Sequence, residues 1–155
     1  PATLAPVLRQ VVDGLQLLAQ ERHVAVELEA GEDVVVRGDR DELLRLFENL
    51  IENGLKYGAS GKKVVITLAR ITNAAGGTEA RVTVRDFGPG IAAEHLPRLT
   101  ERFYRIDVGH SRAEGGTGLG LSLVKHIVNR HRGRLTIESA SGQGAAFSVF
   151  LQIYE

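Results

Sequence analysis

The segment from Arg81 to Leu121 constrains the fold most, because two glycine clusters interrupt an otherwise regular pattern there. Residues 81–86 (RVTVRD) alternate apolar and polar side chains, which predicts a half-buried β-strand. The strand has Asp86 at its end and breaks at residues 88–90 (GPG). A second cluster, residues 115–120 (GGTGLG), precedes an amphipathic helix, where backbone N–H groups can face an anion. The segment therefore predicts a nucleotide site, with Asp86 at the base end and the second cluster at the phosphate end.

The composition excludes several classes of function. Acidic and basic residues number 19 each, so the formal charge is zero, which argues against a general nucleic-acid or membrane-surface binder. The absence of cysteine excludes a disulfide framework, a thiolate zinc site and a cysteine nucleophile. No apolar run is long enough to span a bilayer, and no signal peptide is visible. Because the chain starts at Pro1 and contains no methionine, we expect residues 1–155 to be a single domain excised from a longer parent.

Hydrophobic periodicity predicts three main helices and a sheet. The helices cover residues 4–18, 39–58 and 119–131, and Gly133 is expected at the C′ position of the last one. The expected strands are residues 23–30, 34–37, 62–71, 81–86, 134–139 and 146–153, with 73–78 as a hairpin connection, 93–99 as a helical turn and 104–117 as a loop. These elements predict an α+β fold, a two-layer sandwich in which a mixed, mainly antiparallel sheet carries the helices on one face.

The second helix carries both an apolar and a polar face. Its N-cap is Asp39 or Asp41, and its apolar face consists of Leu43, Leu46, Phe47, Leu50, Ile51 and Leu55. Asn49, Asn53 and Lys56 lie four and three residues apart, so they share one face. A solvated surface would explain one asparagine, but asparagine is a poor residue for a helix interior. Two of them, with Lys56-Tyr57 at the exit, favour a metal–phosphate face, because amide oxygens suit Mg²⁺.

The glycine clusters do not match the common nucleotide-binding loops. No GxxxxGK followed by Ser or Thr occurs, which excludes a P-loop. Residues 116–120 (GTGLG) are not GxGxxG and follow an expected loop, which excludes a Rossmann fingerprint. What is specific is the ordered set of the asparagine helix, DFGPG, ERFYR, GGTGLGL and GQG.

With this ordered set the chain resembles the catalytic ATP-binding domain of sensor histidine kinases. That domain has the Bergerat fold of the superfamily shared with DNA gyrase, the Hsp90 chaperones and MutL-type repair ATPases. The likeness covers nearly the whole chain. Residues 49–57 match the N box, 86–90 the G1 box, 100–105 the F box, 116–120 the G2 box and 142–144 the last glycine box.

The resemblance implies a role for each matched position, with ATP and Mg²⁺ as cofactors. Asn53 would bind Mg²⁺ with support from Asn49, and Lys56 and Arg105 would contact the phosphates. Asn53, Lys56 and Arg105 are therefore the expected catalytic residues. Tyr57 would stack on adenine, and Asp86 would accept a hydrogen bond from its amino group. The other expected ATP-binding residues are Gly88, Gly90, Ile91, Gly116, Thr117, Gly118, Leu119 and Gly120.

Residues 96–107 (LPRLTERFYRID) and 115–131 (GGTGLGLSLVKHIVNRH) resemble the phosphate-regulon sensor kinases more closely. The resemblance implies transfer of the ATP γ-phosphate to a histidine on a separate dimerisation domain of the parent, and a response regulator reached through that domain. It also implies a cytoplasmic location without nucleic-acid or direct membrane contact, although the parent could be an inner-membrane sensor. Two positions depart from the family pattern: Gly54 replaces the usual Ala, and Ala145 replaces a common Thr.

None of the five histidines lies in the HE-containing helix motif that carries the phosphoacceptor, so the acceptor is expected elsewhere in the parent. The five also lack metal-ligand spacing, and His126 is interpreted as structural. The main alternative is a conformational switch that binds or hydrolyses nucleotide, as in the chaperone and gyrase relatives. Their hydrolytic Glu lies four residues before the metal Asn, where this chain has Asn49, which cannot act as a general base.

Two further carboxylates, Glu48 and Glu52, are weaker candidates for that base, because neither occupies the required position on the helix. A degenerate binding domain is a third alternative. Every box retains its key residue, which argues against a degenerate domain. The sequence therefore favours the kinase over both alternatives.

Overall fold

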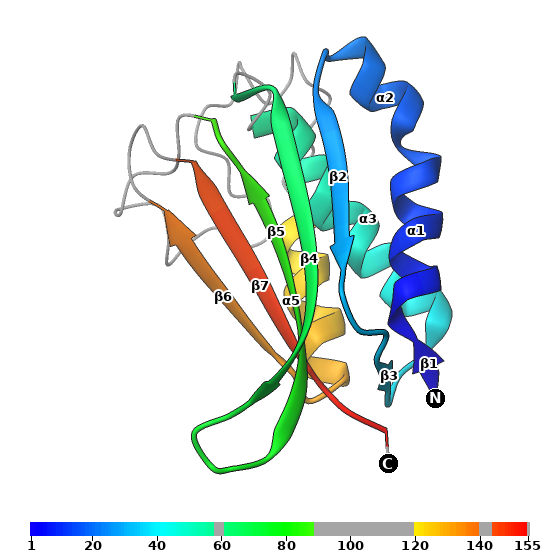
Figure 1. Cartoon of the computed structure of the whole chain (residues 1–155), viewed down its shortest axis with the longest axis vertical. Coiled ribbons are helices and arrows are strands. Elements are labelled where there is room, and N and C mark those ends of the chain that lie inside the picture. Colours follow the sequence, from blue (N-terminus) through cyan, green and yellow to red (C-terminus); the bar gives the residue numbers. More distant parts are fainter. Residues whose placement is uncertain (58–60, 89–119, 140–143, 155) are drawn as a thin grey trace.

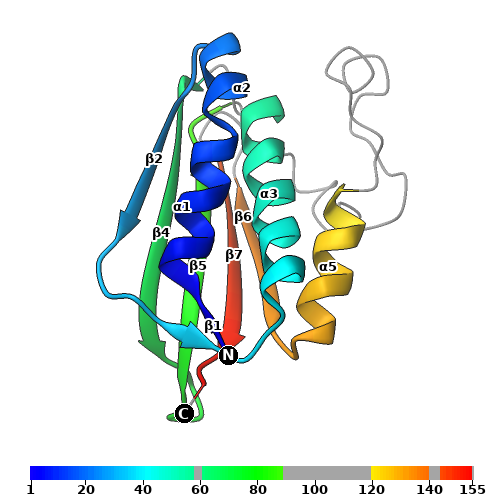
Figure 2. The same ribbon diagram turned by 90° about the vertical axis from the view of Figure 1, so that its right-hand side faces the viewer.

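The computed structural model describes residues 1–57, 61–88, 120–139 and 144–154. Within these residues a five-stranded sheet is covered on one face by four helices, which confirms the predicted α+β sandwich (Figures 1 and 2). The helices are α1 (Leu4–Gly14), α2 (Gln16–Glu21), α3 (Arg40–Tyr57) and α5 (Gly120–Arg130). The strands are β1 (Ala2–Thr3), β2 (Ala25–Ala30), β3 (Val35–Val36), β4 (Lys63–Thr72), β5 (Thr78–Asp86), β6 (Arg134–Ser139) and β7 (Ala145–Gln152).

The main sheet has the strand order β2-β4-β5-β7-β6. Only β2 pairs in parallel, with β4, and the other three pairings are antiparallel, as the sequence predicts. β4 and β5 form the expected hairpin, and their register places Val64 opposite Asp86. The short strands β1 and β3 form a separate ladder, and an isolated bridge from Val36 to Ile153 connects that ladder to the end of the chain.

The core lies between the helices and one face of the sheet. Alternate residues of the three central strands point into it, for example Ile66, Val82 and Val149, each fully or almost fully buried. The six apolar residues predicted for α3 are each at most 1% exposed. This match follows from the helical period of 3.6, which brings those six positions onto a single stripe facing the sheet.

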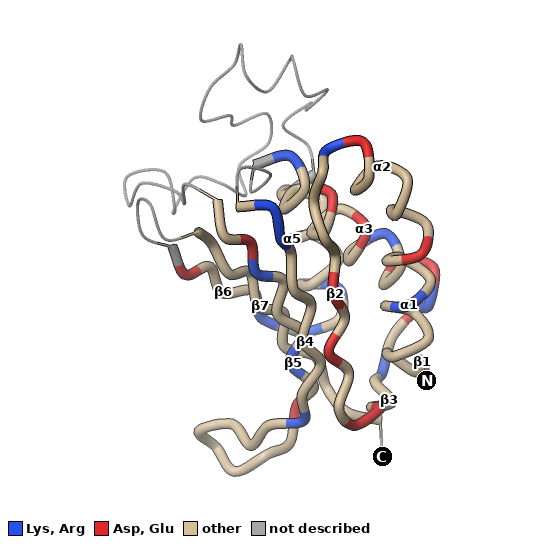
Figure 3. The backbone as a smooth tube through the Cα atoms, turned by 45° about the horizontal axis from the view of Figure 1, so that its top comes forward, with Lys and Arg blue, Asp and Glu red and all other residues tan. Residues whose placement is uncertain are grey.

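The opposite face of the sheet is polar and open. Lys63 Nζ lies 3.0 Å from Glu27, and Arg134 lies 2.7 Å from Glu79, so charged side chains pair across neighbouring strands and between nearby ones. Figure 3 shows Lys and Arg interspersed with Asp and Glu over the part of the chain that the structure describes. In the part of the chain that the structure describes, no helix is long and apolar enough to cross a membrane.

The expected N-terminal helix is divided into two. α1 ends at Gly14, and Leu15 leaves helical geometry with φ −102° and ψ 2° before α2 begins. Glycine costs about 1 kcal/mol relative to alanine in a helix, so the division falls where the sequence is weakest. Leu4, Leu8 and Leu15 are buried as predicted, whereas Leu17 on α2 is 69% exposed.

The end of α5 differs from the sequence prediction in one respect. The sequence predicts the left-handed C′ conformation for Gly133, but Arg132 holds it, with φ 55°. The N–H of Gly133 reaches back to the Val128 carbonyl at 2.9 Å, which makes Gly133 the C″ residue of a Schellman-type ending. Glycine is required there for a different reason: a Cβ would overlap the carbonyl oxygen of Phe150.

A histidine joins the end of α5 to the start of α3. His131 Nδ1 lies 2.8 Å from the Ile127 carbonyl, and its Nε2 accepts the Asp39 N–H at 3.1 Å. Asp39, not Asp41, is the N-cap of α3, because its Oδ1 accepts the N–H groups of residues 41 and 42. His126, for which the sequence favours a structural role, is exposed on α5, so the structural histidine is His131.

Three glycines lie where chain segments meet near the end of β5. A Cβ on Gly54 of α3 would meet Val64 at 3.5 Å, an ordinary van der Waals contact. A Cβ on Gly61 would overlap the backbone carbonyl of Phe87, and one on Gly144 would overlap the carbonyl oxygen of Asp86. Gly54 is therefore replaceable on steric grounds, whereas Gly61 and Gly144 let two segments approach residues 86–88 backbone to backbone.

Substituting alanine at Gly54 and at Gly61 should change stability in opposite directions. Gly54→Ala should raise the free energy of unfolding by about 0.5–1 kcal/mol, because alanine is the better helix former and the site has room. Gly61→Ala should lower it by about 1–3 kcal/mol, because the new methyl group displaces backbone atoms. Urea unfolding of both variants measures the difference, and equal effects of the two substitutions would contradict this packing of the glycines.

Candidate nucleotide-binding site

The site is built around a buried carboxylate at the end of β5. Asp86 is 5% exposed and is the one buried charged side chain among the described residues. Its Oδ1 accepts the N–H of Gly88 at 3.0 Å, and the backbone N–H of Ala145 also donates to the carboxylate. Burial raises the pKa of Asp86 above its usual range, while these two hydrogen bonds and the nearby Arg85 oppose the rise. The fold therefore keeps a hydrogen-bond acceptor at this position despite the cost of desolvating it.

The last turns of α3 pack against the strand residues next to this carboxylate. Gly54 in the last turns of α3 packs on Val64, and Val64 is the residue that pairs with Asp86 across the sheet. Val84, two residues before Asp86 and on the same face of β5, lies 3.9 Å from the same Cβ position. The register of the sheet and the packing of the helix thus bring Gly54, which follows Asn53 in the chain, against the strand residues next to Asp86.

Asn49, Asn53 and Lys56 all remain partly exposed on α3. The Asn49 amide nitrogen donates to the Arg45 carbonyl at 2.8 Å, one turn earlier in the helix. This bond fixes the amide and leaves its oxygen available as an acceptor or ligand. The helix therefore presents amide oxygens and an ammonium group near the Asp86 end of the sheet.

One further titratable group lies on this helix. The pKa of Glu52 is raised, first by burial and second by the charge of Glu48, while Lys56 lowers it. Successive helical residues are about 100° apart around the axis, so Glu52 does not share the face of Asn53. The shift is explained by its surroundings within α3.

The sequence patterns point to Gly88 and to the glycine box that ends at Gly144, but they do not reveal Gly61. Gly61 packs against Phe87 and Gly88 from one side, and Gly144, with φ 81°, packs against Asp86 and Phe87. The only signal for Gly61 is its place between a helix and a strand, which is shared by many glycines of turns. The contact itself is long-range and leaves no local pattern.

Several expected site residues lie outside the described residues: Gly90, Ile91, Arg105, Gly116, Thr117, Gly118 and Leu119. The same holds for the side chain of Tyr57 and for the expected turn at 93–99 and loop at 104–117. Gly120 is described as the first residue of α5, within one residue of the predicted start. Among the described residues no group of three or more His, Cys, Asp or Glu side chains could hold a metal ion.

The chain is similar to curated sensor kinases. It is 38% identical over 148 residues to the phosphate regulon sensor protein PhoR of Pseudomonas aeruginosa, covering 96% of this chain and 32% of that protein. It is 40% identical over 137 residues to the sensor histidine kinase RppB of Synechocystis, covering 88% of this chain and 29% of that protein. The chain thus spans about a third of the length of these relatives.

Solved structures agree with the fold. The mycobacterial sensor histidine kinase MprB superposes with a TM-score of 0.82 at 25% identity, covering 98% of this chain and 95% of that one. Full-length ShkA in complex with AMPPNP superposes with a TM-score of 0.83 at 26% identity, covering 99% of this chain and 30% of that one. The family described as histidine kinase-, DNA gyrase B- and HSP90-like ATPases matches residues 38–155. With three quarters of its length matched, the chain belongs to this ATPase family.

Proposed function

We propose that this chain is the catalytic ATP-binding domain of a two-component sensor histidine kinase. It would bind ATP with Mg²⁺ and donate the γ-phosphate to a histidine on a separate dimerisation domain of a longer parent, from which a response regulator receives it. The observation that carries the proposal is the buried Asp86 carboxylate at the end of β5, where Gly54 in the last turns of α3 packs on Val64, the cross-strand partner of Asp86. The names of the relatives support the kinase assignment, and the AMPPNP bound to ShkA supports the nucleotide.

Asp86 suits the recognition of adenine. A carboxylate has about four acceptor positions, and the two backbone donors fill only part of them. A further position can accept a hydrogen bond from the exocyclic amino group of adenine. Because the carboxylate is buried and fixed by backbone donors, that bond needs little reorganisation when the base arrives.

The phosphate end would be formed by α3 and by residues outside the described part. Asn53, supported by Asn49, would offer a hard oxygen ligand to Mg²⁺, which neutralises phosphate charge when it is bound. Lys56 and Arg105 would contact the phosphates, and residues 116–120 would face them with backbone N–H groups. Tyr57, Gly88, Gly90 and Ile91 would complete the base end.

The alternative of a hydrolytic switch receives no support from the described residues. It requires a general base four residues before the metal asparagine, and Asn49 at that position has a neutral amide tied to the Arg45 carbonyl. Transfer to a histidine needs no such base, because an imidazole nitrogen is itself the nucleophile.

We further propose a cytoplasmic domain that contacts neither nucleic acid nor membrane directly.

Loss of the metal ligand should abolish transfer. The domain is mixed with radiolabelled ATP, Mg²⁺ and the histidine-bearing helical domain of its parent, and label on the histidine is measured. Asn53→Ala should reduce the labelling rate by at least about a hundredfold, because phosphate charge is no longer neutralised in position. Asn129→Ala, which alters an exposed asparagine of α5, is the matched control and should label at the wild-type rate. Wild-type protein that leaves the histidine unlabelled would refute the kinase assignment, and full activity of Asn53→Ala would refute the role of Asn53.

The charged carboxylate of Asp86 should lower the free energy of unfolding of the unliganded domain at neutral pH. Its pKa is higher in the folded state than in the unfolded chain, so the folded state binds more protons between those two values. The contribution of Asp86 to the free energy of unfolding is therefore complete below about pH 4, which is the pKa of an aspartate in the unfolded chain. It is lost as the pH rises through the pKa of Asp86 in the folded state. Asp86→Asn keeps an acceptor oxygen but has no charge to desolvate.

The free energy of unfolding of Asp86→Asn should accordingly exceed that of the wild type by an amount that grows from pH 4 to pH 7. Denaturant unfolding without nucleotide over this range measures the difference. A variant that is less stable than the wild type at pH 7 would show instead that the charged carboxylate stabilises the fold.

A further inference from the structure

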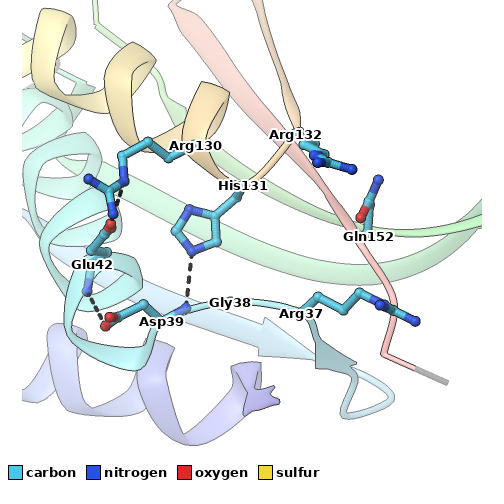
Figure 4. Close-up of a pocket in the computed structure, with 8 residues that line it drawn as sticks. All are labelled: Arg37, Gly38, Asp39, Glu42, Arg130, His131, Arg132 and Gln152. Carbon is cyan, nitrogen blue, oxygen red and sulfur yellow. Dashed lines mark hydrogen bonds and ion pairs between the residues drawn. The ribbon is translucent and has the colours of Figure 1, made fainter.

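A pocket lies at the end of the helical layer opposite the proposed nucleotide site. It has a volume of about 400 Å³ and is formed by the turn between β3 and α3, the first turn of α3, the end of α5 and the end of β7 (Figure 4). Glu42 in this pocket and Asn53 on the polar face are eleven positions apart on α3. At 1.5 Å per residue they are separated by about 16 Å along the helix axis. The pocket is therefore distinct from the proposed nucleotide site.

The pocket has one neutralised side and one cationic side. On the neutralised side Arg130 pairs with Glu42 at 2.9 Å, and the Asp39 carboxylate caps α3. On the other side Arg37 and Arg132 have no carboxylate partner among the described residues. Arg37 lies over the Tyr154 ring at 5.8 Å, and its guanidinium has no hydrogen-bond partner among the described residues.

Figure 4 shows Arg37, Arg132 and Gln152 on the same side of the pocket, away from Glu42. Two planar guanidinium forks and an amide thus line one side of the pocket. This is the donor set that matches the oxygens of a phosphate or carboxylate group. Each fork can donate two parallel hydrogen bonds, and the amide adds a third donor group.

The backbone of Arg132 is consistent with a role for its side chain. Its φ of 55° is the conformation that glycine adopts at the end of a helix at little cost. A side chain there costs stability, and the guanidinium of Arg132 makes no ion pair with the described residues that would offset this. The cost is explained if the side chain acts on a ligand.

We propose that this pocket binds a small molecule through an oxyanion head group, a phosphate ester or a carboxylate, held by Arg37, Arg132 and Gln152. The unpaired Oε2 of Glu42 on the opposite side disfavours a second anionic group there. The ligand therefore carries its charge at one end only. Because α3 begins and α5 ends at this pocket, the bound ligand contacts the same two helices that reach the proposed nucleotide site.

Binding is measured by calorimetric titration of the domain with inorganic phosphate and, separately, with acetate, which carries a single carboxylate. Phosphate stands for a phosphate ester and the second probe for a carboxylate, so the probe that binds more tightly identifies the head group. Arg132→Gly and Arg37→Gln should each weaken binding about tenfold or more, because each removes charge-assisted hydrogen bonds. Arg132→Gly should fold at least as well as the wild type, because glycine is preferred at that φ.

Two control variants locate the binding. Arg9→Gln removes an exposed arginine of α1 outside the pocket, and Lys56→Gln removes the cation of the proposed phosphate face. Both should bind the tighter probe with the wild-type affinity. Failure of both probes to bind at millimolar concentration would overturn the proposal. It would equally be overturned if Arg132→Gly and Arg37→Gln bound as tightly as the wild type, or if Lys56→Gln alone lost binding.

Discussion

The burial of one carboxylate organises the end of the sheet on which the proposed site depends. Asp86 is held by backbone donors from Gly88 and Ala145, and it sits opposite Val64, on which α3 packs. These contacts join the hairpin β4–β5, the start of β7 and the last turns of α3 around one acceptor. Desolvation raises the free energy of its charged form, as the direction of its pKa shift records. A cost of this kind is typical of a residue retained for binding.

Close backbone packing follows from the same arrangement. Gly61 and Gly144 approach residues 86–88 from two directions at distances that exclude any Cβ, whereas Gly54 has room for one. Close backbone contact thus requires glycine at positions 61 and 144 but not at position 54. The departure of Gly54 from the family pattern is a loss of helix propensity without a steric reason, and the family alanine would fit.

The fold was predictable because its elements have strong periodic patterns. The six apolar residues of α3 and the alternation of β5 each specify one buried face, and the structure buries those faces. Periodicity could not place the break at Leu15 or assign the left-handed residue at the end of α5, because Arg132 is no glycine and propensity disfavours it there. The order of the motifs points to Asn49, Asn53 and Asp86 as site residues, and their role in binding nucleotide stays a prediction. The close packing of Gly61 and the pocket lined by Arg37 and Arg132 depend on contacts between distant segments. Such contacts leave no local signal in the sequence.

Nucleotide discrimination tests the central role of Asp86 most directly. Adenine offers an amino donor where guanine offers a carbonyl oxygen, so GTP would place two acceptors against each other. An unsatisfied buried polar group costs about 1–3 kcal/mol, which corresponds to one to two orders of magnitude in affinity. We therefore predict that calorimetry with Mg²⁺ will give an ATP dissociation constant about ten to a hundred times lower than that of GTP. In Asp86→Asn the ratio between the GTP and ATP dissociation constants should be smaller, because an amide can turn a donor toward the guanine oxygen. Equal binding of ATP and GTP by the wild-type domain would contradict the account and reduce Asp86 to a turn-capping residue.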